Sequence, residues 1–355
     1  MSYLFAGLSL LILSAHASPI PALDVAKRWT STVGGGGNAN FPDPAVTEVD
    51  GKWYAFATRT IGSSIHIQVA ESSDFSTWTI ATNPDGSQHD ALPNLPSWVN
   101  AASPNTWAPD IVQLEDNTFI MYYSATTASN PSAHCIGAAK ASTILGPYEP
   151  TSPDALICPI DQGGAIDASG FTDAGQRYIV YKIDGNSIGH GGACGGNVAP
   201  YVPTPLMLQA VAADGLTLQG ASTILLDNAG ASDQGIVEAP ALTKVGPTYI
   251  LFFSSNCFAA GQYTLSYATS QSISGPYIRA TQPLLSTGTQ GLKSPGGADV
   301  HTDGVHIVFH GGYDGGRTMY QGTISVESGV VSIDSGDWTA YILGGLESGA
   351  QSAQA

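Results

Sequence analysis

Residues 41–58 have the sequence FPDPAVTEVDGKWYAFAT, and this stretch sets the pattern for most of the chain. Asp43 stands in a turn before a short apolar run, and a tight Asp50-Gly51 turn then leads into an aromatic segment that begins at Trp53. An Asp-Gly pair between two short runs of strand-forming residues is typical of a β-hairpin. We therefore predict a hairpin that opens on an acidic residue.

Four later segments repeat this plan, at residues 108–123, 165–181, 236–253 and 297–310. With the first segment included, their opening acids are Asp43, Asp110, Asp167, Glu238 and Asp299. Neighbouring acids are 57 to 71 residues apart, so five units account for nearly all of the 355-residue chain. A repeat this long holds several strands and is typical of radial repetition. The sequence therefore predicts an all-β fold, a five-bladed β-propeller.

Propeller geometry indicates where these acids meet. If the first strand of each hairpin is the innermost strand of a blade, its opening residue lies at one end of the central channel. Five carboxylates are then expected to converge there, where like charges at close range raise one another's pKa. Because sites that accept this cost are usually functional, we expect the active-site pocket at that end of the channel.

Composition limits the classes of partner. Charged residues are only 11% of the chain, and the 42 Gly and 22 Pro residues favour turns and short strands over long helices. The net charge of −17 argues against nucleic-acid binding, which relies on clustered Lys and Arg. We expect one catalytic domain, residues 41–345, a polar tail, residues 346–355, a neutral substrate and a monomer.

The N-terminal residues have the pattern of a secretory signal. Residues 4–13 are apolar, and Ala15-His16-Ala17 has the small-x-small pattern of a signal-peptidase site, so residues 1–17 are predicted to be a signal peptide. The apolar run is too short to span a bilayer, so a secreted, extracellular protein without a membrane partner is expected. Lys27-Arg28 is either a site for trimming a pro-segment within residues 18–40 or an exposed basic pair.

Four cysteines in a secreted chain predict two disulfides. They are Cys135, Cys158, Cys194 and Cys257, and they allow three pairings. We favour Cys135 with Cys158, because both fall between the second and third opening acids, which leaves Cys194 with Cys257. A zinc site is not expected, since no CxxC spacing occurs.

Paired carboxylates across a pocket are what glycosidic hydrolysis requires. One protonates the leaving oxygen and the other activates water or attacks carbon. The segments around the acids resemble the four signature segments of glycoside hydrolase family 43. They are Asn40-Phe41-Pro42-Asp43-Pro44, Trp107-Ala108-Pro109-Asp110, Ala165-Ile166-Asp167 with Phe171, and Val237-Glu238-Ala239-Pro240. The resemblance implies a five-bladed propeller and an inverting enzyme that trims arabinose- or xylose-containing plant cell-wall polysaccharides.

The resemblance also implies roles for individual residues. Asp43 matches the family's general base, Glu238 its general acid, and Asp167 the carboxylate that orients the acid and raises its pKa. Asp110 lies in a WAPD motif whose family role is structural. Trp107 is expected to line the pocket and bind substrate through its aromatic face, the alternative being a core tryptophan.

The fifth segment departs from the family pattern. Many members have Pro-Gly-His where this chain has Pro295-Gly296-Gly297, and that histidine binds a metal ion in the channel. Its absence counts against a bound calcium or sodium ion here. Asp299 is the residue that could supply an oxygen ligand instead. His301, His306 and His310 are not spaced like a common ligand set, so no metal-binding residue and no cofactor is predicted. The resemblance also makes His310 and Arg317 candidates for binding the substrate. The alternative for His310 is a hydrogen-bonded structural histidine. The alternative for Arg317 is a surface arginine.

The favoured function is an exo-type α-L-arabinofuranosidase or arabinanase. Long loops at residues 83–105 and 184–205 support exo action, because they would close a groove into a pocket. The alternatives are a β-xylosidase, a sugar-binding propeller that has lost catalysis, and a retaining enzyme on fructans. A non-catalytic propeller would lack one of the three acids, and the Val237-Glu238-Ala239-Pro240 segment fits family 43 better than the fructan enzymes.

Overall fold

The computed structural model describes residues 39–313 and 315–334. The predicted signal peptide, nearly all of the predicted pro-segment and the predicted polar tail lie outside these residues. The described residues form five four-stranded antiparallel sheets, and the strands of each sheet follow one another in chain order. In this part of the chain no helix is long and apolar enough to cross a membrane.

Each sheet is one blade of the fold. Blade 1 consists of β1 (Ala45–Val49), β2 (Lys52–Thr58), β3 (Ile67–Ser72) and β4 (Thr79–Ile80). Blade 2 consists of β5 (Trp107–Gln113), β6 (Phe119–Thr126), β7 (His134–Ala141) and β8 (Glu149–Pro150). Blade 3 consists of β9 (Ala165–Asp173), β10 (Gln176–Ile183), β11 (Leu206–Val211) and β12 (Leu218–Leu226).

Blades 4 and 5 complete the fold. Blade 4 consists of β13 (Val237–Val245), β14 (Thr248–Ser255), β15 (Thr264–Ser270) and β16 (Ile278–Arg279). Blade 5 consists of β17 (Gly296–Val300), β18 (His306–Tyr313), β19 (Gly316–Glu327) and β20 (Val330–Asp334). Short 3-10 helices lie in the connections, namely η1 (Ile160–Gln162), η2 (Gly230–Asp233), η3 (Phe258–Ala260) and η4 (Thr289–Gly291).

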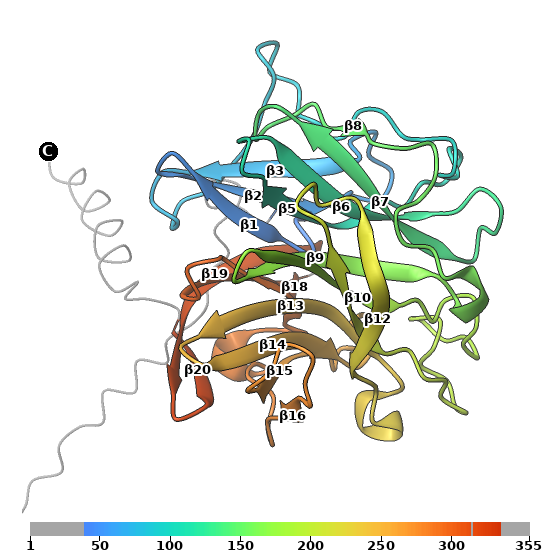
Figure 1. Ribbon diagram of the computed structural model, residues 1–355, viewed down its shortest axis with the longest axis vertical. Coiled ribbons are helices and arrows are strands. Elements are labelled where there is room, and N and C mark those ends of the chain that lie inside the picture. Colours follow the sequence, from blue (N-terminus) through green and yellow to red (C-terminus); the bar gives the residue numbers. More distant parts are fainter. Residues whose placement is uncertain (1–38, 314, 335–355) are drawn as a thin grey trace, which may run out of the picture.

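The first strands of the five blades form a closed ring. β1 contacts β5, β5 contacts β9, β9 contacts β13, β13 contacts β17, and β17 contacts β1. The blades follow one another around the molecule, so that blade 1 and blade 5 lie side by side (Figure 1). The predicted five-bladed propeller is confirmed, and Asp110 and Asp299 lie on the inner strands β5 and β17 as predicted.

A local distortion recurs where each inner strand begins. One residue there has a left-handed backbone: Asp43 (φ 52°), Ala108 (φ 39°), Asp167 (φ 57°), Ala239 (φ 51°) and Gly297 (φ 56°). In blades 2 to 5 the pairing with the second strand shifts at this point, as in a β-bulge. These five residues occupy the same position in their blades. In each blade the residue before the left-handed one pairs with the same end of the second strand. The paired residues on the second strands are Thr58, Ser124, Lys182, Ser254 and His310.

This equivalence corrects the expectation that the five acids share one position of the repeat. Asp43 and Asp167 are the left-handed residues themselves, whereas Glu238 immediately precedes one. Asp110 and Asp299 lie two residues after the left-handed residue of their blades. Loops of variable length between the blades hide shifts of one or two residues, so the sequence spacing could not reveal the difference. The acids therefore divide into two groups.

Hydrogen bonds join each blade to the preceding one through these left-handed residues. At four junctions the N–H of the left-handed residue donates to the side chain at the end of the preceding second strand. These bonds are Ala108 N to Thr58 Oγ1 (2.8 Å), Asp167 N to Ser124 Oγ (2.9 Å), Gly297 N to Ser254 Oγ (2.8 Å) and Asp43 N to His310 Nδ1 (3.1 Å). At the fifth junction Lys182 offers no acceptor, and Ala239 N donates instead to Asp167 Oδ2 at 2.9 Å.

Apolar side chains fill the space between neighbouring blades. Five buried clusters occur in the described residues, one at each junction. At the junction of blades 5 and 1, Trp78 and Phe41 pack with Val308 and Met319, and Trp78 Nε1 donates to Gln321 Oε1 at 2.8 Å. The blade 1 and blade 5 sheets are each built from one continuous segment, so among the described residues no strand crosses this junction.

Both favoured disulfides are present. Cys135 and Cys158 are bonded with Cα atoms 4.9 Å apart, and Cys194 and Cys257 are bonded with Cα atoms 5.7 Å apart. The second bond ties the insertion at residues 184–205 to the loop that follows β14. Because this insertion has little regular structure, the disulfide limits the positions that it can adopt relative to blade 4.

Candidate active site

Asp43 lies among groups that stabilise its ionised form. Its carboxylate accepts a hydrogen bond from Arg317 Nη1 at 2.7 Å and from Thr58 Oγ1 at 2.6 Å, and His310 Nδ1 lies 3.2 Å from Oδ1. Burial alone would raise the pKa of Asp43, but Arg317, His310 and Thr58 together hold it well below its usual range. Asp43 is therefore ionised from acid to neutral pH.

Glu238 is paired with a buried cation. Lys182 Nζ lies 3.2 Å from Glu238 Oε2, and the side chain of Lys182 is only 6% exposed. Burial would lower the pKa of Lys182, but Glu238, Asp167 and Asp184 outweigh it and raise that pKa above its ordinary value. Lys182 thus keeps a full positive charge beside the carboxyl of Glu238.

Asp167 shares this environment from the neighbouring blade. Its Oδ2 accepts the N–H of Ala239, the residue directly after Glu238. Burial, and next the carboxylate of Glu238, raise the pKa of Asp167, while Lys182 and the Ala239 N–H lower it. Two acidic groups are thus held together beside one lysine, and they favour retention of a proton between them.

The three acids therefore fall into two electrostatic states. Asp43 is an anion stabilised by a guanidinium, whereas burial and the neighbouring Glu238 raise the pKa of Asp167. Acid catalysis and base catalysis at one pH require such a difference between two carboxyl groups. The arrangement thus places a carboxyl group that favours a proton near one that is held as an anion.

Asp110 and Asp299 form the second group of acids. Asp110 Oδ2 accepts the N–H of Gly170 at 2.6 Å, and Asp299 Oδ2 accepts the N–H of Val46 at 2.8 Å. Burial raises the pKa of both, and the charge of Asp299 raises the pKa of Asp110 further. A cavity of about 40 Å³ lies between this group and the residues around Asp43 and Asp167.

The fit of a channel cation can be judged from these residues. Gly297 replaces the family's histidine, and a side chain at this position would collide with the ring of His310. Asp110 and Asp299 are hard oxygen donors with raised pKa values beside a cavity. They fit a hard cation such as Ca²⁺ or Na⁺, and a shared proton would relieve their repulsion equally well.

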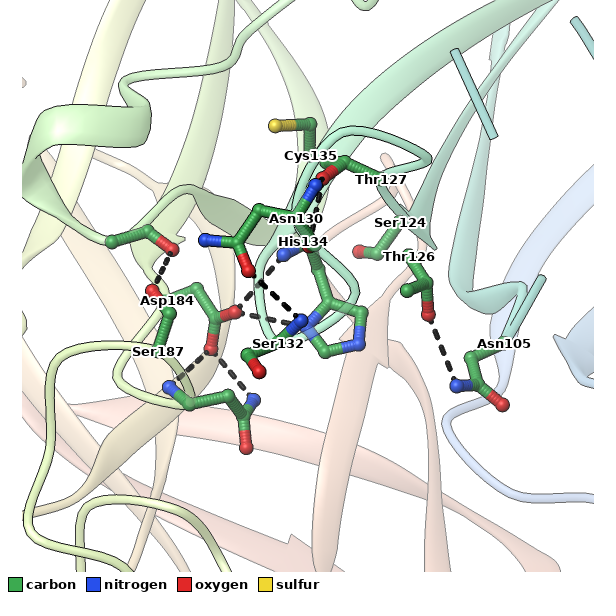
Figure 2. A network of polar contacts seen from close by, with 12 residues as sticks. Asn105, Ser124, Thr126, Thr127, Asn130, Ser132, His134, Cys135, Asp184 and Ser187 are labelled. Carbon is green, nitrogen blue, oxygen red and sulfur yellow. Dashed lines mark hydrogen bonds and ion pairs between the residues drawn. The ribbon is translucent and has the colours of Figure 1, made fainter. Parts of the chain in front are cut away.

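Trp107 precedes the left-handed Ala108 and so occupies the position that Glu238 holds in blade 4. Its ring lies against the imidazole of His134, with centroids 4.2 Å apart. Buried Asp184 accepts from this imidazole, with Oδ2 2.9 Å from Nδ1 (Figure 2). Asp184 also accepts two hydrogen bonds from Asn186. The His134–Asp184 pair thus fixes the ring behind Trp107.

The other two residues expected to bind the substrate, Arg317 and His310, both contact the carboxylate of Asp43. The guanidinium of Arg317 bonds to Asp43 and packs over the ring of Phe258, with its Cζ 4.7 Å from the ring centroid. His310 has no exposed surface and stacks against Tyr263, with centroids 5.7 Å apart. Its burial favours the expected alternative for His310, a structural histidine.

Sequence reasoning missed the residues that surround the acids. Lys182, Thr58, Ser124 and His134 come from second or third strands, and no motif marks them. Lys182 carried one usable signal, because a lysine at the end of the apolar run YIVYKI is unusual for a strand buried on both faces. Its partner could not be inferred, since the contact joins two blades.

The family model for glycosyl hydrolases family 43 matches residues 37–327. The chain belongs to glycoside hydrolase family 43. Family 43 is an inverting family of glycoside hydrolases, and its members act on polysaccharides. The predicted enzyme class is therefore confirmed, and an oligo- or polysaccharide is the substrate class that the family implies.

Relatives in family 43 include named arabinanases. The chain is 27% identical over 296 residues to extracellular endo-alpha-(1->5)-L-arabinanase 1 of Bacillus subtilis. This match covers 78% of this chain and 81% of that protein. The chain is also 27% identical over 158 residues to the extracellular endo-alpha-(1->5)-L-arabinanase of Thermotoga petrophila. This match covers 41% of this chain but only 32% of that protein. A crystal structure of a thermostable family-43 glycoside hydrolase has the same fold, with a TM-score of 0.70, 23% identity, and coverage of 86% of this chain and 96% of that chain.

Proposed function

We propose that this chain is a secreted, inverting hydrolase of α-L-arabinofuranosyl bonds in plant cell-wall polysaccharide. The observation that carries the proposal is the contrast between Asp43, held as an anion by Arg317, and Asp167 beside Glu238, because burial and Glu238 raise the pKa of Asp167. The arabinan substrate is supported by the relatives, which are named endo-arabinanases. Secretion is supported by the word extracellular in their names and by the two disulfides.

In the proposed mechanism Asp43 is the general base and Glu238 is the general acid. Asp43 removes a proton from a water molecule as the water oxygen attacks the anomeric carbon. The bond from that carbon to the glycosidic oxygen breaks, and Glu238 transfers its proton to the leaving oxygen. The products are a sugar of inverted configuration and the shortened alcohol, and proton exchange with solvent restores both carboxyl groups.

Asp167 and Lys182 support the acid at different stages. Asp167 is fixed beside Glu238 by the Ala239 N–H and favours the protonated form of its neighbour before reaction. After proton transfer Glu238 is a carboxylate, and Lys182, 3.2 Å away, stabilises it. A cation placed where negative charge develops lowers the barrier without reorganisation.

Two residues are proposed to bind the substrate, Trp107 and Arg317. Arg317 would release Asp43 and donate to a sugar hydroxyl instead. The indole face suits the apolar face of a pentose, and the His134–Asp184 pair prevents the ring from tilting away from the channel mouth. His310 is proposed to act through Asp43, because it is wholly buried. No step requires a cofactor.

Exo action is proposed because of the insertion at residues 184–205. It begins beside Lys182, and its disulfide to Cys257 holds it on the blade that carries Glu238. Tyr201, from the same insertion, packs on Gly235, two residues before β13 begins. A wall tethered on this side is expected to block an extended polysaccharide from passing across the acids.

Product analysis of linear arabino-oligosaccharides tests the proposal. Exo action releases arabinose from the first time point and shortens the chain by one unit, whereas internal cleavage yields mixed oligosaccharides. Proton NMR of the first-formed sugar should show inversion. Release of xylose from xylo-oligosaccharides alone would replace the proposal with a β-xylosidase, and hydrolysis of neither substrate would favour a sugar-binding propeller.

A further inference from the structure

The turn between β17 and β18 gathers three potential metal ligands. Asp303 Oδ2 lies 3.2 Å from His301 Nδ1 and 2.6 Å from His306 Nδ1, and the three ligand atoms all lie within 4.8 Å of one another. The side chains are partly accessible, with 14%, 35% and 30% of the surface of His301, Asp303 and His306 exposed. This cluster lies at the end of β17 opposite to the catalytic acids.

Sequence spacing did not suggest this cluster. His301 and His306 are five residues apart, but the turn folds the chain back so that His301 N donates to the carbonyl of His306 at 2.9 Å. Asp303 Oδ1 accepts the N–H groups of Val305 and His306 at 2.8 and 3.0 Å. His301 Nδ1 also accepts the N–H of Asp303, at the longer distance of 3.4 Å, while Oδ2 of Asp303 faces both imidazoles.

A second turn shows that this backbone does not need histidines. At the β11–β12 turn, Asp214 Oδ1 accepts the N–H groups of Leu216 and Thr217, and Ala212 N donates to the carbonyl of Thr217. Gly215 and Gly304 have φ angles of 68° and 69°. The two turns have the same hydrogen bonds, but Ala212 and Thr217 stand where the other turn has its two histidines. Thr217 Oγ1 also donates to Asp214 Oδ2 at 2.7 Å, in the place where the ring of His306 bonds to Asp303 Oδ2. A hydroxyl is thus enough for this contact, and the turn does not require two imidazoles.

Aromatic side chains of blade 1 hold both imidazoles in place. The ring of Trp53, on β2, lies 4.8 Å from the ring of His301 and 4.7 Å from that of His306 between centroids. Phe75, in the β3–β4 turn, packs on His306 at 4.5 Å. Rings held in this way lose little further freedom when they bind a ligand.

We propose that His301, Asp303 and His306 form a binding site for a late first-row divalent cation, of which Zn²⁺ is the probe. Two imidazole nitrogens and one carboxylate oxygen are a donor set that zinc takes in proteins, with bonds of about 2.0–2.2 Å. Tetrahedral ligands at that radius are about 3.3 Å apart. The His301–Asp303 separation of 3.2 Å already matches this spacing, whereas His306, 2.6 Å from Asp303, would have to move outward to bind the metal. The solvent-facing side leaves the fourth position to water.

The location indicates what the metal would do. Blades 5 and 1 meet here, and among residues 39–313 and 315–334 side-chain contacts and hydrogen bonds join them without a shared strand. A cation bound by both histidines would fix the β17–β18 turn against Trp53 and Phe75. The site is therefore structural, and its effect is on the stability of the closed ring.

Calorimetric titration of the chelator-treated full-length protein with ZnCl₂ tests the proposal, together with thermal unfolding at each metal concentration. We expect one high-affinity Zn²⁺ per chain and a rise in Tm of about 5 °C at 100-fold excess over Kd. Ca²⁺ at the same concentration should leave Tm unchanged. Catalytic activity is not the readout, so the result is independent of the proposed function.

Matched variants locate the bound metal. Asp303→Asn keeps the turn acceptor Oδ1 and removes the anionic ligand, so it should fold normally and lose the zinc-dependent rise in Tm, as should His306→Gln. Asp214→Asn makes the same change in the turn without histidines and should behave as wild type. The proposal is overturned if wild type binds no stoichiometric zinc, or if Asp303→Asn and His306→Gln bind it as wild type does.

Discussion

The two groups of carboxylates in the channel differ in the cations around them. Asp43 forms an ion pair with Arg317 and Glu238 forms one with Lys182, whose charge also lowers the pKa of Asp167. Asp110 and Asp299 accept backbone N–H groups and, among the described residues, form no ion pair with Lys or Arg. All five come from the same part of the repeat, so position along the inner strand decides which carboxyl groups meet a cation.

The largest expected effect in the first group is that of Glu238→Gln. Loss of the proton donor should reduce the hydrolysis rate of substrates with poor leaving groups by roughly 10²–10⁴. Substrates with good aryl leaving groups need less protonation and should lose much less. Steady-state kinetics on both substrate types measure the difference. Equal losses on both would contradict the role of Glu238 as general acid.

Asp43→Asn makes the complementary change in the same group. Water activation is required whichever group departs, so this variant should be slow on both substrate types, again by roughly 10²–10⁴. An Asp43→Asn enzyme with near-normal rates would remove Asp43 from the mechanism.

Removing the cation beside the acid is expected to have the next largest effect. Lys182→Met should reduce kcat by about 10² and raise the pKa of Asp167, because Lys182 lowers it. The alkaline limb of the pH–rate profile should then move to higher pH. Lys244→Met, at a surface pair with Asp173, is the control and should show neither change. An unshifted alkaline limb in Lys182→Met would argue that the lysine is only structural.

A smaller effect is expected from the cation beside the base. Arg317→Gln removes the guanidinium that lowers the pKa of Asp43, so this pKa should rise. Activity needs ionised Asp43, so the acidic limb of kcat/KM should move to higher pH. The control Arg177→Gln, whose guanidinium donates to the carbonyl of Gln113, should leave that limb in place. A profile for Arg317→Gln that coincides with wild type would separate Arg317 from the base.

The smallest effect is expected in the second group. Burial raises the folded-state pKa of Asp299 above its ordinary value of 3.8, so the folded protein binds protons more tightly than the unfolded chain and stability falls as pH rises above that range. Asp299→Asn keeps an acceptor for the Val46 N–H and should reduce this fall by roughly 1–2 kcal/mol. Denaturant unfolding from pH 4 to pH 8 measures it. An unchanged slope would show that the charge is compensated.

The sequence was sufficient for the repeat and the family because both depend on local patterns. Asp-Gly turns, aromatic strands and the acid spacing predict five hairpin units, and the motifs around Asp43, Asp167 and Glu238 identify family 43. The disulfide between Cys135 and Cys158 followed from its position between two opening acids. These features need no knowledge of how the blades meet.

What the sequence could not provide are the contacts between blades. The pairing of Lys182 with Glu238 joins blades 3 and 4, and the bond from Arg317 to Asp43 joins blades 5 and 1. Neither contact has a periodic signal, because the residues are 56 and 274 positions apart. The left-handed residues were equally hidden, since only one of the five is glycine.

The left-handed residue at the start of each inner strand also matters for redesign. At three of these positions the ring of blades uses only the N–H of the residue. At Asp43 and Asp167 it also uses the side chain, which accepts from Arg317 and from the N–H of Ala239, respectively. The side chain is Asp, Ala, Asp, Ala or Gly from blade 1 to blade 5. Aspartate tolerates this backbone conformation better than most residues. Ala108→Asp would therefore place a new carboxylate beside Trp107 without disturbing the bond from the N–H of residue 108 to Thr58. Position 108 is thus a site where a further acidic group could be introduced to change the reaction.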